Sequence, residues 1–453
     1  MKNRTKYLVL LDMLCANGAL LLTYVLIADE SFRYFHPTLP GAVRGVVVVL
    51  CALLSSYFME LYSRDLVLDL AALAARIAVS LNLSFLGLSL FIFIVPTLTV
   101  GQRFLSYYLL GFGLIQFLLH AGFRFVEQKF KLLPKVLILG AGFLAARIGE
   151  VVSGLSQNYV LTGYIPAGSE QIEVPREKIV GEELNLYQVA LKERVDKIVV
   201  AVNDRRHEYP LQQILSCKLH GISVFDAPGF YEKAMGKLLI EQITPEWFVF
   251  SQGFCISSLR RAVKRYCDIL ISLVAMPALL LLFPVVALVI KLDSAGPVFF
   301  QQLRVGENEK PFALYKLRTM HNNAEFETGA IWAQAGDPRI TRIGNFLRKC
   351  RLDEFPQLYN VLRGDMSIVG PRPERPEFIE QLKEIIPYYS ERHLIKPGVT
   401  GWAQVNYPYG ASVEDAIEKL RYDLYYLKNF SLQLDVMIVL ETVKVVFNQR
   451  GGR

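Results

Sequence analysis

Residues 264–291 read KRYCDILISLVAMPALLLLFPVVALVIK, and this stretch decides how the C-terminal part of the chain folds. The run from Ile269 to Ile290 is apolar and long enough to cross a hydrocarbon core of about 30 Å as a helix. Pro284 lies near its middle, where a proline removes a backbone donor and favours a kink. A plain membrane span that tolerates its proline is the competing interpretation, and hydropathy alone favours it.

Basic residues flank the apolar run on both sides. Those before it are Arg260, Arg261, Lys264 and Arg265, and those after it are Lys291, Arg304 and Lys310. Lysine and arginine concentrate on the cytoplasmic side of membrane proteins, so both flanks are expected on that side. We therefore expect a re-entrant helix near residues 266–291, which enters the membrane, breaks at Phe283–Pro284 and returns to the same face.

Four further apolar stretches fill the first 130 residues. They predict membrane-spanning helices over Tyr7–Ala28, Ala42–Leu61, Leu70–Val95 and Phe104–Val126, each long enough to cross a bilayer. Basic residues precede the first stretch and follow the fourth, which predicts that the N-terminus and everything after residue 127 are cytoplasmic. Residues 1–130 are thus expected to form a four-helix transmembrane bundle. The alternative, a soluble helical bundle, fits four consecutive stretches of this apolarity poorly.

Residues 131–255 alternate short strand patterns with helical patterns, which is typical of a parallel α/β sheet. Lys135–Leu139 reads as a buried strand, and the loop that carries Gly140, Gly142 and Ala145 then opens a helix. This is the context of a dinucleotide-binding fingerprint and predicts a Rossmann-like domain. The acid that would hold a ribose is missing after the second strand. Both a nucleotide-binding loop and a tight packing turn therefore remain open.

Composition excludes several classes of function. The net charge of +7 suits an anionic membrane surface or phosphate-rich substrates. The basic residues are not gathered into one tract, and no zinc-finger or RNA-recognition signature is present, so no nucleic-acid partner is expected. The six cysteines form no CxxC pair, which argues against a zinc site and against a disulfide framework.

The densest cluster of reactive side chains is in residues 348–375, RKCRLDEFPQLYNVLRGDMSIVGPRPER. Asp353 and Glu354 are adjacent acids, and neighbours on a helix point about 100° apart, so they can act differently at one centre. One carboxylate could attack phosphorus or hold a metal while the other moves a proton. The surrounding guanidinium groups match phosphate oxygens. The pattern favours phosphoryl transfer to a lipid, although an adjacent Asp-Glu pair is usually a solvated salt-bridge face.

A series of motifs runs in order from about Arg260 to the C-terminus. They are Lys264–Asp268 (KRYCD), Gly296–Gln301 (GPVFFQ), Arg304–Gly306 (RVG), Phe312–Met320 (FALYKLRTM), Asp353–Asn360 (DEFPQLYN), Gly364–Pro373 (GDMSIVGPRP) and Lys396–Asn406 (KPGVTGWAQVN). In these motifs the chain resembles the bacterial sugar transferase family, the monotopic polyprenyl-phosphate phosphoglycosyl transferases. As a whole it is similar to the large members that start exopolysaccharide, capsule or O-antigen repeat units.

The resemblance implies a covalent transfer of a sugar 1-phosphate from a UDP-sugar to polyprenyl (undecaprenyl) phosphate. Asp353 would attack the β-phosphate, expel UMP and hold the sugar phosphate, while Glu354 would handle a proton or position a group. Mg²⁺ would lie by Asp353. The candidates for phosphate or nucleotide contacts are Lys316, Arg318, Arg348, Arg372 and Arg375. The family's re-entrant helix usually breaks at a Ser-Pro pair, and the matching pair here is Phe283–Pro284.

The expected architecture is a membrane helical bundle, a Rossmann-like domain and a mixed α/β catalytic domain over residues 256–453. The expected setting is the lipid bilayer of a bacterial inner membrane, with the soluble domains in the cytoplasm and a homodimer as the assembly. A membrane-anchored nucleotide-sugar dehydratase or epimerase is one alternative, but its Tyr-x-x-x-Lys pair is missing from the middle domain. A non-enzymatic scaffold for polysaccharide assembly is the other.

Overall fold

The computed structural model describes residues 4–27, 39–62, 70–129, 133–167, 171–181, 185–202, 210–322, 324, 337–408, 410 and 412–447. The chain divides into two compact units, Met1–Phe230 and Tyr231–Arg453.

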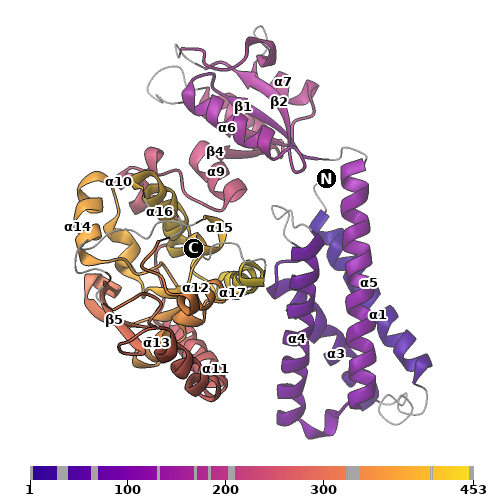
Figure 1. Cartoon of the computed structure of the whole chain (residues 1–453). Helices are drawn as coiled ribbons and strands as arrows, with labels where there is room; N and C mark the ends of the chain where they lie inside the picture. The colour runs from indigo at the N-terminus through magenta and orange to yellow at the C-terminus, as the bar shows by residue number, and fades with distance from the viewer. Residues whose placement is uncertain are drawn as a thin grey trace. The chain divides into compact units, whose positions relative to one another are not determined.

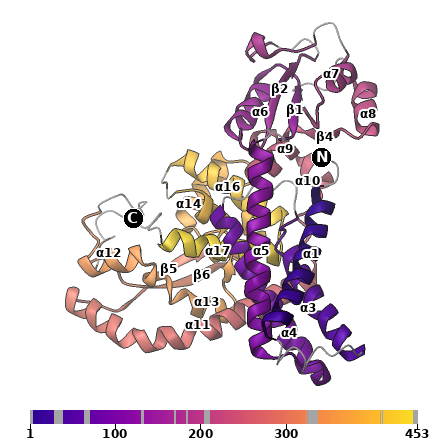
Figure 2. The same cartoon turned by 90° about the vertical axis from the view of Figure 1, so that its right-hand side faces the viewer.

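Four long helices begin the first unit and lie side by side (Figures 1 and 2). They are α1 (Arg4–Leu26), α3 (Leu39–Phe58), α4 (Leu70–Ile94) and α5 (Gln102–Lys129), with the short η1 (Pro96–Leu98) between the last two. Each holds a segment long and apolar enough to cross a membrane, namely Tyr7–Leu26, Gly41–Phe58, Leu70–Ile94 and Gln102–Val126. The prediction of four apolar N-terminal helices is confirmed.

A buried polar network joins three of these helices. Asp12 on α1 lies 3.0 Å from Nε2 of His120 on α5, and Gln116 on α5 donates to both Asp12 and Ser56. All four side chains are buried. Hydrogen bonds between apolar helices fix which of their faces meet, so this network sets the packing of α1, α3 and α5.

The rest of the first unit is built around a four-stranded parallel sheet in the order β2-β1-β3-β4. Its elements are β1 (Lys135–Leu139), α6 (Phe143–Gly154), β2 (Val160–Ile165), η2 (Arg176–Lys178), α7 (Leu186–Lys192), β3 (Lys197–Val200), α8 (Leu211–Leu219), β4 (Ser223–Asp226) and α9 (Ala227–Met235). Strand β1 is almost wholly buried, as expected for a central strand of a parallel sheet. The predicted parallel sheet is present.

The glycine loop after β1 makes close backbone contacts. Gly140 has a φ of +126°, and a Cβ there would lie 2.3 Å from the carbonyl oxygen of Ala201, just beyond β3. Its N–H donates to the carbonyl of Ile165 at 2.8 Å. Gly142 precedes the first turn of α6, and Ala145 is buried on that helix. These contacts explain the glycine by packing, and nucleotide binding by the loop stays a prediction.

The second unit is mainly helical, with an antiparallel hairpin of β5 and β6 and a short parallel pair of β7 and β8. Its elements are η3 (Ile240–Gln242), α10 (Pro245–Phe250), α11 (Ser258–Asp293), β5 (Phe299–Val305), η4 (Glu307–Glu309), β6 (Pro311–Leu317), α12 (Arg342–Lys349), η5 (Leu352–Glu354), α13 (Gln357–Arg363), β7 (Ser367–Val369), α14 (Pro376–Ile385), η6 (Ser390–Leu394), β8 (Gly398–Thr400), α15 (Trp402–Asn406), α16 (Val413–Lys428) and α17 (Leu432–Phe447).

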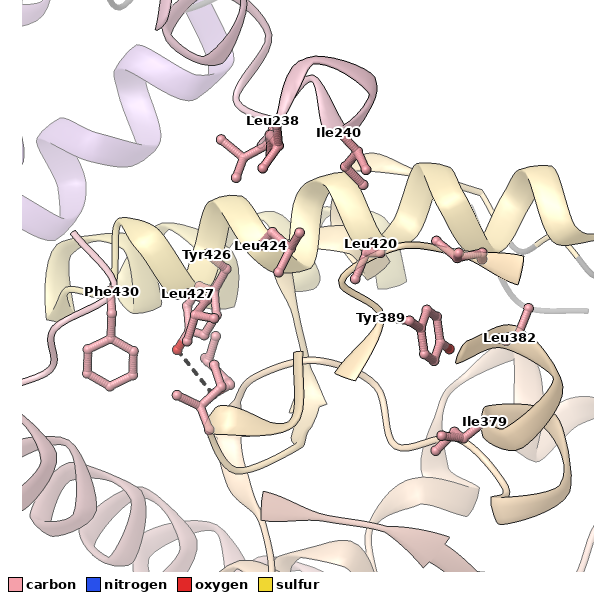
Figure 3. Close-up of a cluster of buried hydrophobic side chains, with 14 of the residues drawn as sticks. Leu238, Ile240, Ile379, Leu382, Tyr389, Leu420, Leu424, Tyr426, Leu427 and Phe430 are labelled. Carbon is pink, nitrogen blue, oxygen red and sulfur yellow. Dashed lines mark hydrogen bonds between the residues drawn. The ribbon is translucent and has the colours of Figure 1, made fainter. Parts of the chain in front are cut away.

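Helix α16 runs through the core of this unit. Figure 3 shows Leu238 and Ile240 on one side of α16, and Ile379 and Tyr389 on the other. Because Leu238 and Ile240 are buried here, the segment before α11 belongs to the C-terminal unit. The second compact unit, Tyr231–Arg453, includes this segment, and the boundary between residues 255 and 256 stays a prediction.

Helix α11 lies along one side of the C-terminal unit and is bent (Figure 2). Its segments Ser258–Pro277 and Leu279–Asp293 meet at 57°. The bend thus lies beside Pro277, N-terminal to Phe283–Pro284, where the sequence suggests the break. Each proline removes one backbone hydrogen bond, but Phe283 is held in the second segment, because its ring stacks on Phe299 of β5 at 5.2 Å.

Candidate functional site

The acidic pair lies in η5, a single turn between α12 and α13. Arg351 precedes it with a left-handed φ of 55°, which turns the chain sharply after α12. Asp353 and Glu354 are both buried, with 8% and 7% of their surface exposed. Carboxylates are seldom this buried unless they are paired with charged groups, so their partners define the chemistry of the site.

Glu354 is held by three cations. Its Oε1 accepts from Nζ of Lys316 at 3.2 Å and from the guanidinium of Arg372 at 3.0 Å. Arg351 lies 3.7 Å from the other oxygen. Burial alone would raise the pKa of Glu354, but Arg372, Lys316 and Arg351 outweigh it and hold that pKa well below its ordinary value. The carboxylate is therefore ionised and fixed in orientation.

Asp353 differs from its neighbour in having free oxygens. Among the residues that the structure describes, it has no hydrogen-bond or ion-pair partner. Burial raises its pKa above the ordinary value, and the charge of Glu354 adds to the rise, while Lys316, Arg348 and Arg372 oppose it. A buried carboxylate without partners, among cations, has its lone pairs available for an incoming group.

The cations come from separate elements that the fold brings together. Lys316 lies on β6, and Asn360 of α13 holds that hairpin by donating to the carbonyl of Ala313 at 2.7 Å and accepting from the amide of Tyr315. Arg348 on α12 donates to the Thr319 hydroxyl at 2.9 Å. Of the predicted phosphate contacts, Lys316, Arg348 and Arg372 thus act on the acidic pair directly or through their charge.

Two other predicted contacts have different roles. The guanidinium of Arg318 is buried and donates to the carbonyls of Ser294 and Ala295, at the C-terminal end of α11. Gly296 makes room for it, because a Cβ there would lie 2.0 Å from that guanidinium. Arg375 precedes α14, where it lies 3.6 Å from Glu377. Arg318 therefore anchors α11 and has its guanidinium already engaged.

The site is joined to both halves of α11. In the N-terminal half, Lys264 pairs with Asp435 at 2.7 Å, and Asp268 accepts from the amide of Ile368. In the C-terminal half, Ile290 belongs to a buried cluster. Leu352, the residue before Asp353, packs against that cluster. The acidic pair thus lies directly beside the apolar helix.

The pattern of acids and arginines did not reveal a buried ion pair behind Arg372. Arg392 on η6 donates to Asp423 on α16 at 3.0 Å and to the backbone carbonyl of Arg372 at 3.0 Å. Both side chains are almost fully buried. The one signal in the sequence is Asp423 within the otherwise apolar face of the Tyr422–Tyr426 stretch.

A divalent cation fits this site only as an ion that arrives with phosphate. The described residues contain no group of three or more acidic, histidine or cysteine side chains able to surround a metal. The oxygens of Glu354 are engaged by cations, which leaves Asp353. Mg²⁺ is commonly bound by one or two carboxylates together with substrate phosphates and water, so a single carboxylate is compatible with it.

Comparisons with known proteins point to one family. The bacterial sugar transferase family matches residues 259–449. The chain is 40% identical over 261 residues to UDP-N-acetylgalactosamine-undecaprenyl-phosphate N-acetylgalactosaminephosphotransferase of Aeromonas hydrophila, covering 57% of this chain and 61% of that protein. It is 32% identical over 322 residues to undecaprenyl-phosphate glucose phosphotransferase of Komagataeibacter xylinus, covering 69% of this chain and 59% of that protein.

These two matches span less than two thirds of each relative. A shorter relative, the exopolysaccharide production protein PSS of Rhizobium leguminosarum bv. phaseoli, is 43% identical over 186 residues, which cover 40% of this chain and 93% of that protein. That match covers nearly the whole of the relative. Residues 259–449, which the family matches, contain the acidic pair and its cations. The chain belongs to the bacterial sugar transferase family.

Proposed function

We propose that this protein transfers a sugar 1-phosphate from a UDP-sugar to polyprenyl phosphate, such as undecaprenyl phosphate. The observation that carries the proposal is the contrast within the acidic pair. Asp353 is buried among cations with no partner among the described residues, while Glu354 is held by Lys316 and Arg372. The relatives' names, which specify undecaprenyl phosphate as acceptor, support the lipid substrate.

In the first step, a carboxylate oxygen of Asp353 attacks the β-phosphorus of the UDP-sugar. The bond from that phosphorus to the oxygen bridging the two phosphates breaks, and UMP leaves with the electron pair. The sugar phosphate stays on Asp353 as an acyl phosphate. Lys316, Arg348 and Arg372 balance the negative charge that builds up on the phosphoryl oxygens.

In the second step, an oxygen of polyprenyl phosphate attacks the same phosphorus. The bond to Asp353 breaks, its carboxylate is regenerated, and the product is a polyprenyl diphosphate sugar. Because Glu354 accepts from both Lys316 and Arg372, it acts by positioning these two cations, whose charge also holds its pKa below the ordinary value. Asp353 would hold Mg²⁺, which neutralises phosphate charge when bound.

The membrane setting follows from the same elements. The chain is membrane-anchored through its apolar helices. We propose that the bent α11 is a re-entrant helix at the cytoplasmic face of a bacterial inner membrane. Its two segments meet at 57°, and each half is tied to the water-soluble fold, which supports a return to the same face. A Rossmann-like role for the middle domain, and the homodimer, stay predictions.

The test is UMP release by the full chain in nanodiscs with Mg²⁺, undecaprenyl phosphate and a panel of UDP-sugars. Release with at least one sugar, lost in Asp353→Asn, is expected. Omitting the lipid should leave a sugar-phosphate adduct on the intact protein, visible by mass spectrometry and absent from Asp353→Asn. Glu380→Gln, an exposed carboxylate on α14, is the control that should retain activity.

Folded wild-type protein that releases no UMP with any sugar would refute the proposal. Copurified NAD would then favour the dehydratase or epimerase. Polysaccharide assembly in cells that persists with Asp353→Asn would favour the scaffold.

A further inference from the structure

The Pro-Arg-Pro turn that carries Arg372 is held in place by hydrogen bonds from other segments of the chain. Pro371 and Pro373 have no backbone N–H, so the turn cannot be fixed by its own donors at these positions. The structure instead holds three consecutive carbonyls from outside. Gly398 donates to Pro371 O at 2.9 Å, Arg392 to Arg372 O at 3.0 Å, and Arg304 to Pro373 O at 3.0 Å.

Arg392 is the central member of this set and is itself held by two other side chains. Its Nε and one terminal nitrogen bind Asp423 on α16, at 3.0 and 2.7 Å. Its other terminal nitrogen donates to the Tyr389 hydroxyl at 2.8 Å. Arg392 is 4% exposed and Asp423 is 1% exposed. Because Asp423 and Tyr389 hold the guanidinium at all three of its nitrogens, an N–H is presented to Arg372 O in a fixed direction.

Arg392 is linked to the acidic pair through Arg372. The carbonyl that Arg392 holds belongs to the residue whose side chain donates to Glu354 at 3.0 Å. Figure 3 shows Tyr389 packed beside α16 in the core, so η6 and α16 form a rigid support. We propose that Arg392 and Asp423 are positioning residues that aim the guanidinium of Arg372 at Glu354, an inference that rests on the function proposed above.

A positioning role for Arg392 differs measurably from mere structural support. Lysine at position 392 would keep the charge but offers one nitrogen in place of the three that contact Asp423, Tyr389 and the carbonyl of Arg372, so it cannot reproduce this geometry. Misplacement of a group at a catalytic centre by about 1 Å costs on the order of 100-fold in rate. We expect Arg392→Lys and Asp423→Asn each to lower the turnover of UDP-sugar to UMP by roughly 10- to 100-fold.

The deciding experiment is a double-mutant cycle on turnover with Arg372→Ala. If Arg392 acts through the side chain of Arg372, Arg392→Lys should change turnover by less than about twofold once that side chain is gone. Independent, multiplicative losses would overturn the proposal. Tyr389→Phe, which removes only the hydroxyl partner, should give a smaller loss that is also absent in the Arg372→Ala background.

The control and a second readout separate this inference from the proposed function. Arg421→Lys changes another ion-paired arginine of α16 and should leave turnover within about twofold. Hydrogen exchange at the Gly398 amide, which donates to Pro371 O, should speed up in Arg392→Lys and not in Arg421→Lys. This readout needs no activity. Wild-type protein without UMP release would refute the proposed function, whereas unchanged exchange at Gly398 would refute the positioning role.

Discussion

The two adjacent acids should respond in opposite ways to neutralisation. Glu354 accepts from Lys316 at 3.2 Å and from Arg372 at 3.0 Å. Removing one partner of a buried ion cluster costs about 3–5 kcal/mol. Glutamine keeps one acceptor oxygen, so Glu354→Gln should lie at the low end, near 3 kcal/mol. Asp353→Asn removes no described partner and relieves the burial of a charge, so stability should be unchanged or raised.

The assay is thermal unfolding of the full chain in detergent at pH 7, with UMP release measured on the same samples. For a unit of 150–250 residues, 1 kcal/mol shifts the midpoint by about 2–4 °C. Glu354→Gln should therefore lower the midpoint by roughly 6–12 °C, by the same conversion, while Asp353→Asn abolishes activity without lowering it. Equal midpoint losses in the two variants, or none in Glu354→Gln, would refute this reasoning.

The same contrast has a pH dependence with a definite sign. The pKa of Glu354 is held below its ordinary value in the folded protein. Its stabilising contribution is therefore complete above the unfolded pKa of about 4.3 and is lost as pH falls through the lower folded pKa. The difference in midpoint between wild type and Glu354→Gln should be full at pH 7 and should shrink progressively below about pH 4. A difference that grows on acidification contradicts the assignment.

Three further substitutions test the fold that positions the site. Arg318→Gln should lower the free energy of unfolding by about 1.5–3 kcal/mol, because carbonyls at the end of α11 lose a charged donor. Proteolysis after α11 should then be faster than in the control Arg375→Gln, and equal rates would contradict this prediction. Gly140→Ala should lower the free energy of unfolding by about 2–3 kcal/mol through backbone strain and steric overlap, and hydrogen exchange in β1 should become faster. Gly154→Ala, in α6 with open space around a Cβ, should leave that exchange unchanged. Asn360→Ala should lower the free energy of unfolding by about 2 kcal/mol and lower turnover, because it releases the hairpin that carries Lys316. Unchanged turnover would show that Asn360 does not position Lys316.

Structural features that depend on the local pattern of residues can be predicted well from the sequence. Long apolar runs predict the four N-terminal helices, and alternating short patterns predict the parallel sheet. The acidic pair, Arg348 and Arg372 stand out in one dense stretch of charged residues, which needs only spacing and residue type. Lys316 is a candidate only through the family resemblance, because nothing in its own neighbourhood links it to the acidic pair.

Features that depend on tertiary partners escaped the same reasoning. Arg318 stands in a motif beside Lys316, and its binding to the end of α11 depends on the close approach that Gly296 permits. Arg392 and Asp423 are 31 residues apart and carry no shared pattern. The bend in α11 lies beside Pro277, while Phe283 stacks on Phe299 of the hairpin, and neither can be read from the pattern along the chain.

The contacts of α11 bear on how the protein is made. The described partners that tie the helix to the rest of the C-terminal unit, among them Phe299, Arg318 and Asp435, lie later in the chain. When the helix leaves the ribosome, it is a long apolar segment with basic residues at both ends and has none of these contacts. The ion pair of Lys264 with Asp435 can form only after synthesis has passed Asp435, so the final packing of α11 is a late product of folding.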